Sequence, residues 1–184
     1  MAESNAVVVV ESRRWVASRA RGATLEIGIG GWPSLPFYPA DVALTGLDKR
    51  AKAVAKATRA VALSGRHASV IEGDAMALAY DNESFDCVVF SFSLCGVPQV
   101  HGALVEALRV LRPGGALLMA DHIVSTSRPL RVVQRVAEAF TAPIIGEHWV
   151  RRPSTQARTL GVEIVETERL GRGAIERLHA VKPR

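Results

Sequence analysis

The feature that most constrains the fold is a short apolar run, residues 23 to 27, that ends in a cluster of glycines. The run has the length of a buried strand, and glycines at positions 28, 30 and 31 let the backbone turn tightly where a Cβ atom would clash. Pro33 follows, and proline is favoured in the first turn of a helix because it has no N–H to leave unpaired. A ligand over these glycines would meet free backbone donors at a helix start. The stretch therefore predicts a strand, a ligand-binding loop and a helix, in that order.

Two known fingerprints can be compared with this loop. The dinucleotide pattern G-x-G-x-x-G fits Gly28 and Gly30 but meets Pro33 where its third glycine should stand. The pattern E-x-G-x-G fits Glu26, Gly28 and Gly30, and in this form the stretch resembles the first motif of class I S-adenosylmethionine (SAM)-dependent methyltransferases. That family's usual third glycine falls at Trp32, so the match is partial. The alternative is a strand-to-helix turn that binds no ligand.

Length and composition indicate one domain. The 184 residues are 48% hydrophobic, so we expect residues 1–184 to form a single domain, with a short helical segment at 1–21. Cys87 and Cys95 are too few for a disulfide framework, and no Cys/His spacing suggests a metal site. We expect a reducing, cytoplasmic setting. The apolar run 7–10 is far shorter than the roughly 20 residues that span a bilayer, so neither a signal peptide nor a transmembrane segment is expected.

The formal net charge of +5 raises the question of a nucleic-acid partner. Of the 23 basic residues 19 are arginines spread along the chain, and a local cluster forms only at Arg13, Arg14, Arg19 and Arg21. We interpret this cluster as the solvated face of an N-terminal helix rather than a binding patch. Methyltransferases that act on the exocyclic amines of bases carry an Asn/Asp-Pro-Pro-aromatic motif, which residues 91–98 lack. No sequence-specific nucleic-acid partner is expected.

Apolar patterns along the rest of the chain alternate between helix and strand. The prolines at 33, 36 and 39 keep the helix after the glycine loop short. The string Arg112-Pro113-Gly114-Gly115 should stop a helix and turn into a strand, and residues 171–173 should join two final strands as an antiparallel hairpin. We expect helices at 7–21, 49–63, 100–111, 130–140 and 153–160, and strands at 23–27, 42–48, 68–72, 85–90, 116–119, 162–168 and 175–181.

These elements predict an α/β fold, a Rossmann-like seven-stranded sheet that is mostly parallel, with helices on both faces. The string from Arg109 to Gly115, Arg-Val-Leu-Arg-Pro-Gly-Gly, is the second point at which the chain resembles the methyltransferase family. The likeness is nearest to the branch of ubiquinone/menaquinone-biosynthesis, phosphatidylethanolamine N- and small thiol methyltransferases. Its further markers are Phe37-Tyr38-Pro39, the run 94–97 and Asp121-His122.

A SAM site can be placed on the ends of the expected strands. Asp48 ends the second strand, about eighteen residues after Gly30, where nucleotide-binding folds use a carboxylate to bind ribose hydroxyls. The resemblance implies that Asp74 binds the adenine amino group and that Met76 flanks the ring. It also places Glu26 near the cationic amino-acid end of the cofactor. The expected cofactor-binding residues are Glu26, Gly28, Ile29, Gly30, Asp48, Lys49, Gly73, Asp74, Ala75, Met76, Ser91 and Phe92.

Methyl transfer from a sulfonium depends mainly on positioning, and a base is needed only when the acceptor must first lose a proton. His122 and His148 are the candidate bases, with Asp121 as an orienting partner, while a structural role is the alternative for each histidine. We expect Cys87 to be inert core and Cys95 to have a packing role. Thiol or phenol acceptors would ionise with little help.

The sequence thus predicts a methyltransferase that converts SAM to S-adenosylhomocysteine on a small, lipophilic thiol, phenol/quinol or amine acceptor. Two alternatives stay open, namely a non-catalytic SAM-binding module that acts through a partner and a nicotinamide-dependent oxidoreductase. With only about twenty residues before the first strand, the acceptor pocket is expected to be open, or closed by residues 123–150 or by a second subunit of a homodimer. The acceptor atom, the oligomeric state and the pathway are not encoded in any motif that we recognise.

Overall fold

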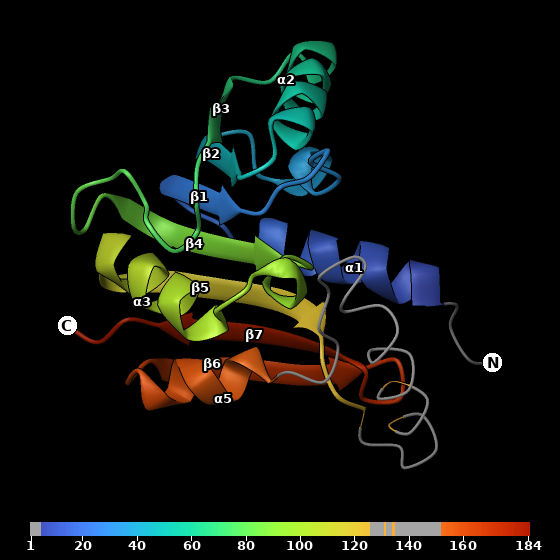
Figure 1. Ribbon diagram of the computed structural model, residues 1–184, viewed down its shortest axis with the longest axis vertical. Coiled ribbons are helices and arrows are strands. Elements are labelled where there is room, and N and C mark those ends of the chain that lie inside the picture. The colour runs from blue at the N-terminus through green and yellow to red at the C-terminus, as the bar shows by residue number, and fades with distance from the viewer. Residues whose placement is uncertain (1–4, 126–130, 132–133, 135–151) are drawn as a thin grey trace.

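The computed structural model describes residues 5–125, 131, 134 and 152–184. These residues form a seven-stranded sheet with the order β3-β2-β1-β4-β5-β7-β6 (Figure 1). All neighbouring strands from β3 to β5 pair in parallel, whereas β7 runs antiparallel to both β5 and β6. The strands are β1 (Ala23–Ile27), β2 (Ala43–Asp48), β3 (Ala68–Glu72), β4 (Phe85–Ser91), β5 (Leu111–His122), β6 (Glu163–Leu170) and β7 (Ile175–Val181). The expected sheet, with one reversed strand in a terminal hairpin, is confirmed.

Helices cover both faces of this sheet. The first face carries α1 (Asn5–Ala17), the 3-10 helix η1 (Leu35–Phe37) and α2 (Ala51–Ser64). These helices pack with alternate strand residues that point to this face, among them Cys87, Val89 and Leu118. The opposite face carries α3 (Val100–Val110) and α5 (Pro153–Thr159), and the 3-10 helix η2 (Leu94–Gly96) precedes α3.

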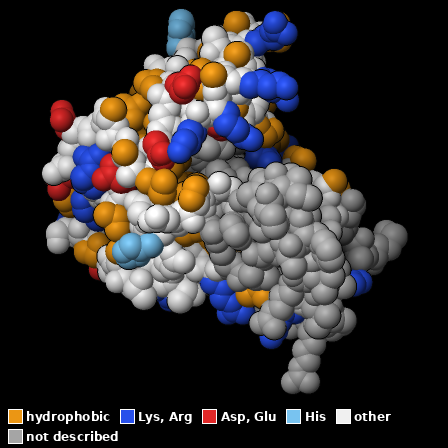
Figure 2. Space-filling model, in the orientation of Figure 1, with side chains coloured by type: hydrophobic (Ala, Val, Ile, Leu, Met, Phe, Trp, Pro, Cys, Tyr) orange, Lys and Arg blue, Asp and Glu red, His pale blue; other side chains and the backbone are white. Residues whose placement is uncertain are grey.

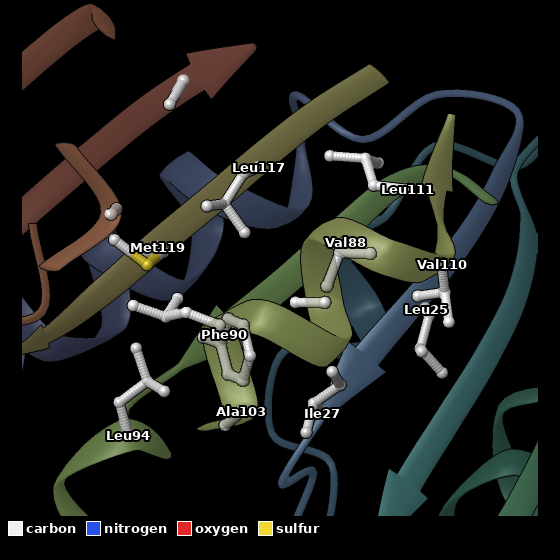
Figure 3. Packing of buried hydrophobic residues seen from close by; sticks show 14 of the residues in the cluster. Leu25, Ile27, Val88, Phe90, Leu94, Ala103, Val110, Leu111, Leu117 and Met119 are labelled. Atoms are coloured by element: carbon white, nitrogen blue, oxygen red, sulfur yellow. The ribbon is translucent and has the colours of Figure 1, made fainter. Parts of the chain in front are cut away.

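The core beneath α3 is built from alternate residues of the central strands. Figure 3 shows Phe90 of β4 next to Ala103 of α3, with Ile27 of β1 on one side and Met119 of β5 on the other. All four are 3% exposed or less. Because successive side chains of a strand point to opposite faces, Glu26, Val89 and Leu118 are left for the α1 side. Apart from Glu26 and Thr24 of β1, the central strands are thus largely apolar on both faces, as expected for a parallel sheet between two helical layers.

One local prediction was wrong. The string Arg112 to Gly115 does not separate helix from strand, because α3 ends at Val110 and β5 already begins at Leu111. Leu111 pairs with Phe85 and Ala116 pairs with Cys87, so residues 112–115 bulge out of the β4 register. The bulge is held instead by the C-terminal segment, since the Gly114 N–H donates to the Lys182 carbonyl and the Lys182 N–H donates to that of Gly115.

Other element boundaries moved by a few residues. The N-terminal helix ends at Ala17 rather than at 21, and the helix after the glycine loop is a single 3-10 turn, as the prolines require. The expected helix at 130–140 lies mostly outside the described residues. Among the residues described, no helix combines the length and apolar character needed to cross a bilayer.

Candidate functional site

A cavity of about 430 Å³ lies where β1, β2, β3 and β4 end. In parallel α/β sheets ligands bind at these carboxyl ends. We call one part of the cavity the β2–β3 end, formed by Leu47–Arg50 and Gly73–Ala75, and the other part the β4 end, formed by residues 92–98 together with Gly28. Its lining comprises Ile27, Gly28, Leu47, Asp48, Lys49, Arg50, Gly73, Asp74, Ala75, Phe92, Ser93, Cys95, Gly96, Val97 and Pro98.

Gly28 joins the glycine loop to the β4 end. Its φ is +76°, and a Cβ atom added there would lie 2.5 Å from Cβ of Ser93. The Gly28 N–H donates to the carbonyl of Leu47 on the neighbouring strand (2.7 Å). Glycine is therefore required at this position both by conformation and by the close approach of the β4 end.

Glu26 does not line the cavity but lies buried behind the glycine loop, 1% exposed. Its carboxylate accepts hydrogen bonds from Trp32 Nε1 (2.6 Å), Ser34 Oγ (2.7 Å) and Tyr38 Oη (2.8 Å). Burial raises the pKa of Glu26, and these donors oppose that rise because they stabilise the charged form. Glu26 thus holds together the segment that follows the glycines.

Trp32 occupies the position of the family's third glycine and adopts φ +59°, a conformation that glycine favours. The bond from its indole N–H to Glu26 helps to hold it there. The ring lies against Gly46 of β2, where an added Cβ would come within 2.6 Å of it. The departure from the family pattern is therefore accommodated by Glu26 and Gly46.

At the β2–β3 end, Asp48 is buried and both of its oxygens have protein partners. The Gly30 N–H donates to Oδ2 (2.8 Å), and the backbone N–H (3.0 Å) and Nε (3.3 Å) of Arg50 donate to Oδ1. A carboxylate offers about four lone-pair sites, so Asp48 keeps capacity for a ligand donor. It ties the second glycine of the loop to the end of β2.

Asp74 lies beside Asp48 and is more exposed. Lys49 Nζ donates to its Oδ2 (2.8 Å) and the Met76 N–H to its Oδ1 (2.9 Å). The hydrogen bond from Lys49 is the main reason why the pKa of Asp74 is lowered. The β2–β3 end therefore presents two carboxyl groups, each paired with a basic residue that follows β2.

The β4 end is anchored by Asp121 of β5, which is 3% exposed. Its carboxylate accepts the backbone N–H groups of Ser93 (3.1 Å), Leu94 (2.7 Å) and His122 (2.8 Å). Burial raises the pKa of Asp121 to about 6, against these hydrogen bonds and one from Cys95. The hydrogen bonds that involve Asp121 thus fix the turn that lines the cavity.

Phe92 begins that turn with φ +55°, and its N–H donates to the Ala120 carbonyl (2.7 Å). Its ring lies 4.9 Å from the ring of His122 and 4.9 Å from the guanidinium carbon of Arg13.

Cys95, Asp121 and His122 each place one atom of a metal-ligating type within 4.8 Å of the others, but Asp121 is already engaged by the backbone. Cys87, by contrast, is core, and burial raises its pKa to about 12.

The members of the N-terminal arginine cluster, of which only Arg13 and Arg14 lie on α1, differ in their surroundings. Arg14 is exposed and pairs with Glu11, and Arg19 pairs with Glu166, as expected for a solvated face. Arg13 differs, because its side chain turns inward and donates from Nη1 to the carbonyl (3.4 Å) and Oγ (3.5 Å) of Ser91.

In the upper part of the surface view, where Figure 1 places α2, basic side chains lie next to acidic ones (Figure 2).

Of the residues expected to bind cofactor, the cavity brings together Gly28, Asp48, Lys49, Gly73, Asp74, Ala75 and Phe92. Glu26, Ile29, Gly30, Met76 and Ser91 do not line it, and His148 lies outside the described residues. Ile27, Leu47 and Arg50 were missed, although the first two could have been found as the last apolar residues of two strands that end at the site. Of the segment that follows β4, residues 92, 93 and 95–98 line the cavity.

Within the described residues, Ser93 has an unpartnered hydroxyl group at the wall of the cavity. It lines the cavity beside Gly28, and its buried Oγ has no hydrogen-bond partner within the described part of the chain. Buried hydroxyl groups are nearly always hydrogen-bonded in native proteins. The cavity therefore offers an unsatisfied polar group next to a loop that comes close to the ligand space.

Comparison with known proteins identifies the family of this chain. Residues 25–119 match a family described as "Methyltransferase domain", a stretch that runs from β1 to β5. The chain belongs to this methyltransferase family. Its cofactor is accordingly S-adenosylmethionine, and the branch proposed from the sequence is confirmed by the curated relatives.

The methyltransferase is similar to the phosphatidylethanolamine N-methyltransferase of Cereibacter sphaeroides, with 33% identity over 121 residues, 65% of this chain and 60% of that protein. It is 39% identical over 84 residues to the demethylmenaquinone methyltransferase of Renibacterium salmoninarum, which covers 46% of this chain and 35% of that protein. The matched regions thus span less than two thirds of these relatives. A solved SAM-dependent methyltransferase from Thermotoga maritima has the same fold, with TM-score 0.71, 21% identity, and coverage of 95% of this chain and 92% of that chain.

Proposed function

We propose that this methyltransferase methylates a small, lipophilic acceptor through a thiol, a phenol or quinol, or an amine. The observation that carries the proposal is the β4 end of the cavity. There the orphaned hydroxyl of Ser93 lies among Cys95, Val97 and Pro98, so one polar group is set in an apolar wall. Such a lining suits an acceptor that is largely apolar and carries one reacting heteroatom. The related proteins named above act on a phospholipid and on a menaquinone precursor, which supports the same acceptor class.

The residues of the cavity fit SAM. Asp48 would accept the ribose hydroxyls with its remaining lone pairs, and Asp74 would accept the purine amino group, with Ala75 and Met76 following it. The cofactor's amino-acid end then falls toward Gly28 and the β4 end. Glu26 would act behind the loop by holding Trp32, Ser34 and Tyr38 rather than by direct contact. Ile29, Gly30, Lys49, Gly73, Ser91 and Phe92 complete the proposed cofactor set.

Bound SAM supplies an activated methyl group, so the protein's task is to position the acceptor in line and keep water out. The turn at residues 92–96, fixed by Asp121, forms the wall against which the acceptor would lie. His122 is not part of the cavity lining, but its ring lies 4.9 Å from that of Phe92, and it would take a proton from a phenol or an amine. Asp121 would assist through the turn and the His122 backbone, and His148 stays a second candidate base.

The test is methyl transfer from labelled SAM to a panel of an alkyl thiol, a naphthoquinol, a phenol and phosphatidylethanolamine in micelles, read as S-adenosylhomocysteine formed. We expect at least one lipophilic acceptor to be methylated well above the protein-free rate. If SAM binds but no member of the panel gives turnover, the acceptor class is wrong and a non-catalytic SAM-binding module becomes the better description.

The role of His122 can be separated from a structural one. His122→Gln should lower kcat by about 100-fold or more for an acceptor that must lose a proton and leave the SAM affinity unchanged. His101 of α3 is exposed, so His101→Gln serves as the matched control. An equal loss in both variants, or a kcat for His122→Gln within a fewfold of the parent, would remove His122 as the base.

A further inference from the structure

Arg13 is the one member of the arginine cluster that the expected solvated face does not explain. Its side chain is partly buried, and this burial lowers its pKa, although the charges of Glu26 and Asp121 act in the opposite direction. No carboxylate among the described residues lies within 4 Å of it, whereas Arg14, Arg19, Arg50 and Arg109 all form ion pairs. A part-buried cation without an ion-pair partner among the described residues is costly, so a bound anion would relieve that cost.

Contacts with Phe92 and Ser91 hold the guanidinium of Arg13 in place, but they engage only part of its hydrogen-bond donors. It lies over the ring of Phe92, and within the described residues only Nη1 donates, in two long bonds to Ser91. Nε and Nη2 make no hydrogen bond there. Neither nearby carboxylate is turned to it, because Glu26 accepts from three side chains and Asp121 from three backbone N–H groups. An arginine stacked on an aromatic ring with a free edge is suited to bind a planar carboxylate in a bidentate manner.

The position of Arg13 indicates which anion it would bind. The two basic residues that line the cavity, Lys49 and Arg50, follow β2 and are paired with Asp74 and Asp48. They neutralise the β2–β3 end. Lys56 lies beside Gly31 and is exposed, whereas Arg13, which does not line the cavity either, is part-buried against Phe92 of the lining. The cofactor's amino-acid group carries a carboxylate. With the ribose at Asp48, this group falls at the β4 end, where the guanidinium of Arg13 lies over the ring of Phe92.

We propose that Arg13 of α1 binds the carboxylate of the cofactor's amino-acid group. The inference rests on the placement of the cofactor given under the proposed function. It makes the N-terminal helix part of the cofactor site rather than only a cover. It also turns a residue of the basic cluster into a specificity determinant for the intact amino acid of SAM.

The test compares two probes that differ by the carboxylate alone, SAM and decarboxylated SAM, by calorimetric titration of the full chain. The parent protein should bind SAM about 10- to 100-fold more tightly than decarboxylated SAM, the range expected of a charge-assisted hydrogen-bonded pair. Arg13→Met should remove most of this difference by weakening SAM and leaving decarboxylated SAM within about twofold. Arg13→Lys should restore part of it, because lysine keeps the charge but not the bidentate geometry.

Arg14→Met is the matched control, since Arg14 is adjacent on the same helix, exposed and paired with Glu11. It should leave both affinities unchanged, as should Lys56→Met. The inference is overturned if Arg13→Met weakens both probes equally or neither, in which case an anion on the acceptor is the alternative partner of Arg13. If Arg13→Met does not fold, equal affinity of the parent protein for the two probes overturns it instead. Failure of the parent to bind either probe would count against the cofactor placement itself.

Discussion

The two ends of the cavity are built in different ways. At the β2–β3 end, the functional groups follow strands directly, and each carboxylate is paired within the site, Asp48 with Arg50 and Asp74 with Lys49. At the β4 end, the turn after β4 is fixed by Asp121 from β5, about thirty residues later, and is flanked by Arg13 from α1. The first end is a property of local sequence, and the second exists only in the assembled sheet.

The difference also appears in the pKa values of the two sets of carboxyl groups. Asp74 is partly exposed and paired with a lysine, which lowers its pKa. Asp121 is buried among backbone donors, and burial raises its pKa to about 6. The pKa shift of the carboxyl group is therefore set mainly by a charged hydrogen-bond partner at the β2–β3 end and mainly by desolvation at the β4 end.

The largest expected effect comes from breaking the contact between the glycine loop and the β4 end. Gly28→Ala should lower the free energy of unfolding by about 2 to 4 kcal/mol, because a Cβ would overlap Ser93 in a left-handed backbone conformation, and should abolish SAM binding. Gly96→Ala lines the same cavity with open space around its Cβ position, so it should change stability by less than about 1 kcal/mol. Urea unfolding and calorimetry measure both effects, and similar results for the two variants would contradict the steric argument.

The second prediction concerns the pH dependence set by Asp121. Its pKa of about 6 exceeds its usual 3.8, so its contribution to stability is full below about pH 4 and is lost as the pH rises through 6. The free energy of unfolding of the parent, relative to Asp121→Asn, should therefore fall by up to about 3 kcal/mol between pH 4 and 7. Urea unfolding across this range measures it.

Asp86 provides the opposite case for comparison. The Arg112 guanidinium lowers its pKa, so its contribution is present above its usual pKa and is lost as the pH falls. The stability difference between the parent and Asp86→Asn should have the reverse slope, and a smaller size because the pair is exposed. A pH-independent difference for Asp121→Asn would show that this carboxyl is not perturbed by burial.

The smallest effect is expected at the β2–β3 end. Lys49→Met removes the partner of Asp74, but the pair is exposed, so unfolding should change by less than about 1 kcal/mol and less still at high salt. The apparent pKa of Asp74, followed by NMR, should rise. Lys52→Met on α2, exposed and without an ion pair among the described residues, is the control. A change in the Asp74 pKa in that variant as well would argue against the specific pair.

The sequence predicted the sheet and the β2–β3 end because both are encoded in short patterns. Apolar runs located every strand, Asp48 stood out as the carboxylate at the end of a strand, and the resemblance to the methyltransferase family added Asp74. Arg13 could not be separated from Arg14 by pattern, since their difference is which side of one turn meets Phe92. The backbone role of Asp121 and the β5 bulge also depend on pairing between distant segments, which no single stretch displays.

Trp32 and Gly46 carry a consequence for the evolution of this family. A tryptophan at the third glycine position requires a β2 residue without a Cβ beneath its ring and a carboxylate at position 26 for its indole N–H. Positions 32 and 46 should therefore change together across homologues, while the carboxylate at 26 belongs to the family motif with either residue at 32. Where position 32 reverts to glycine, position 46 is freed to carry any small strand-forming residue, and a Trp32 lineage with alanine at 46 should be counter-selected.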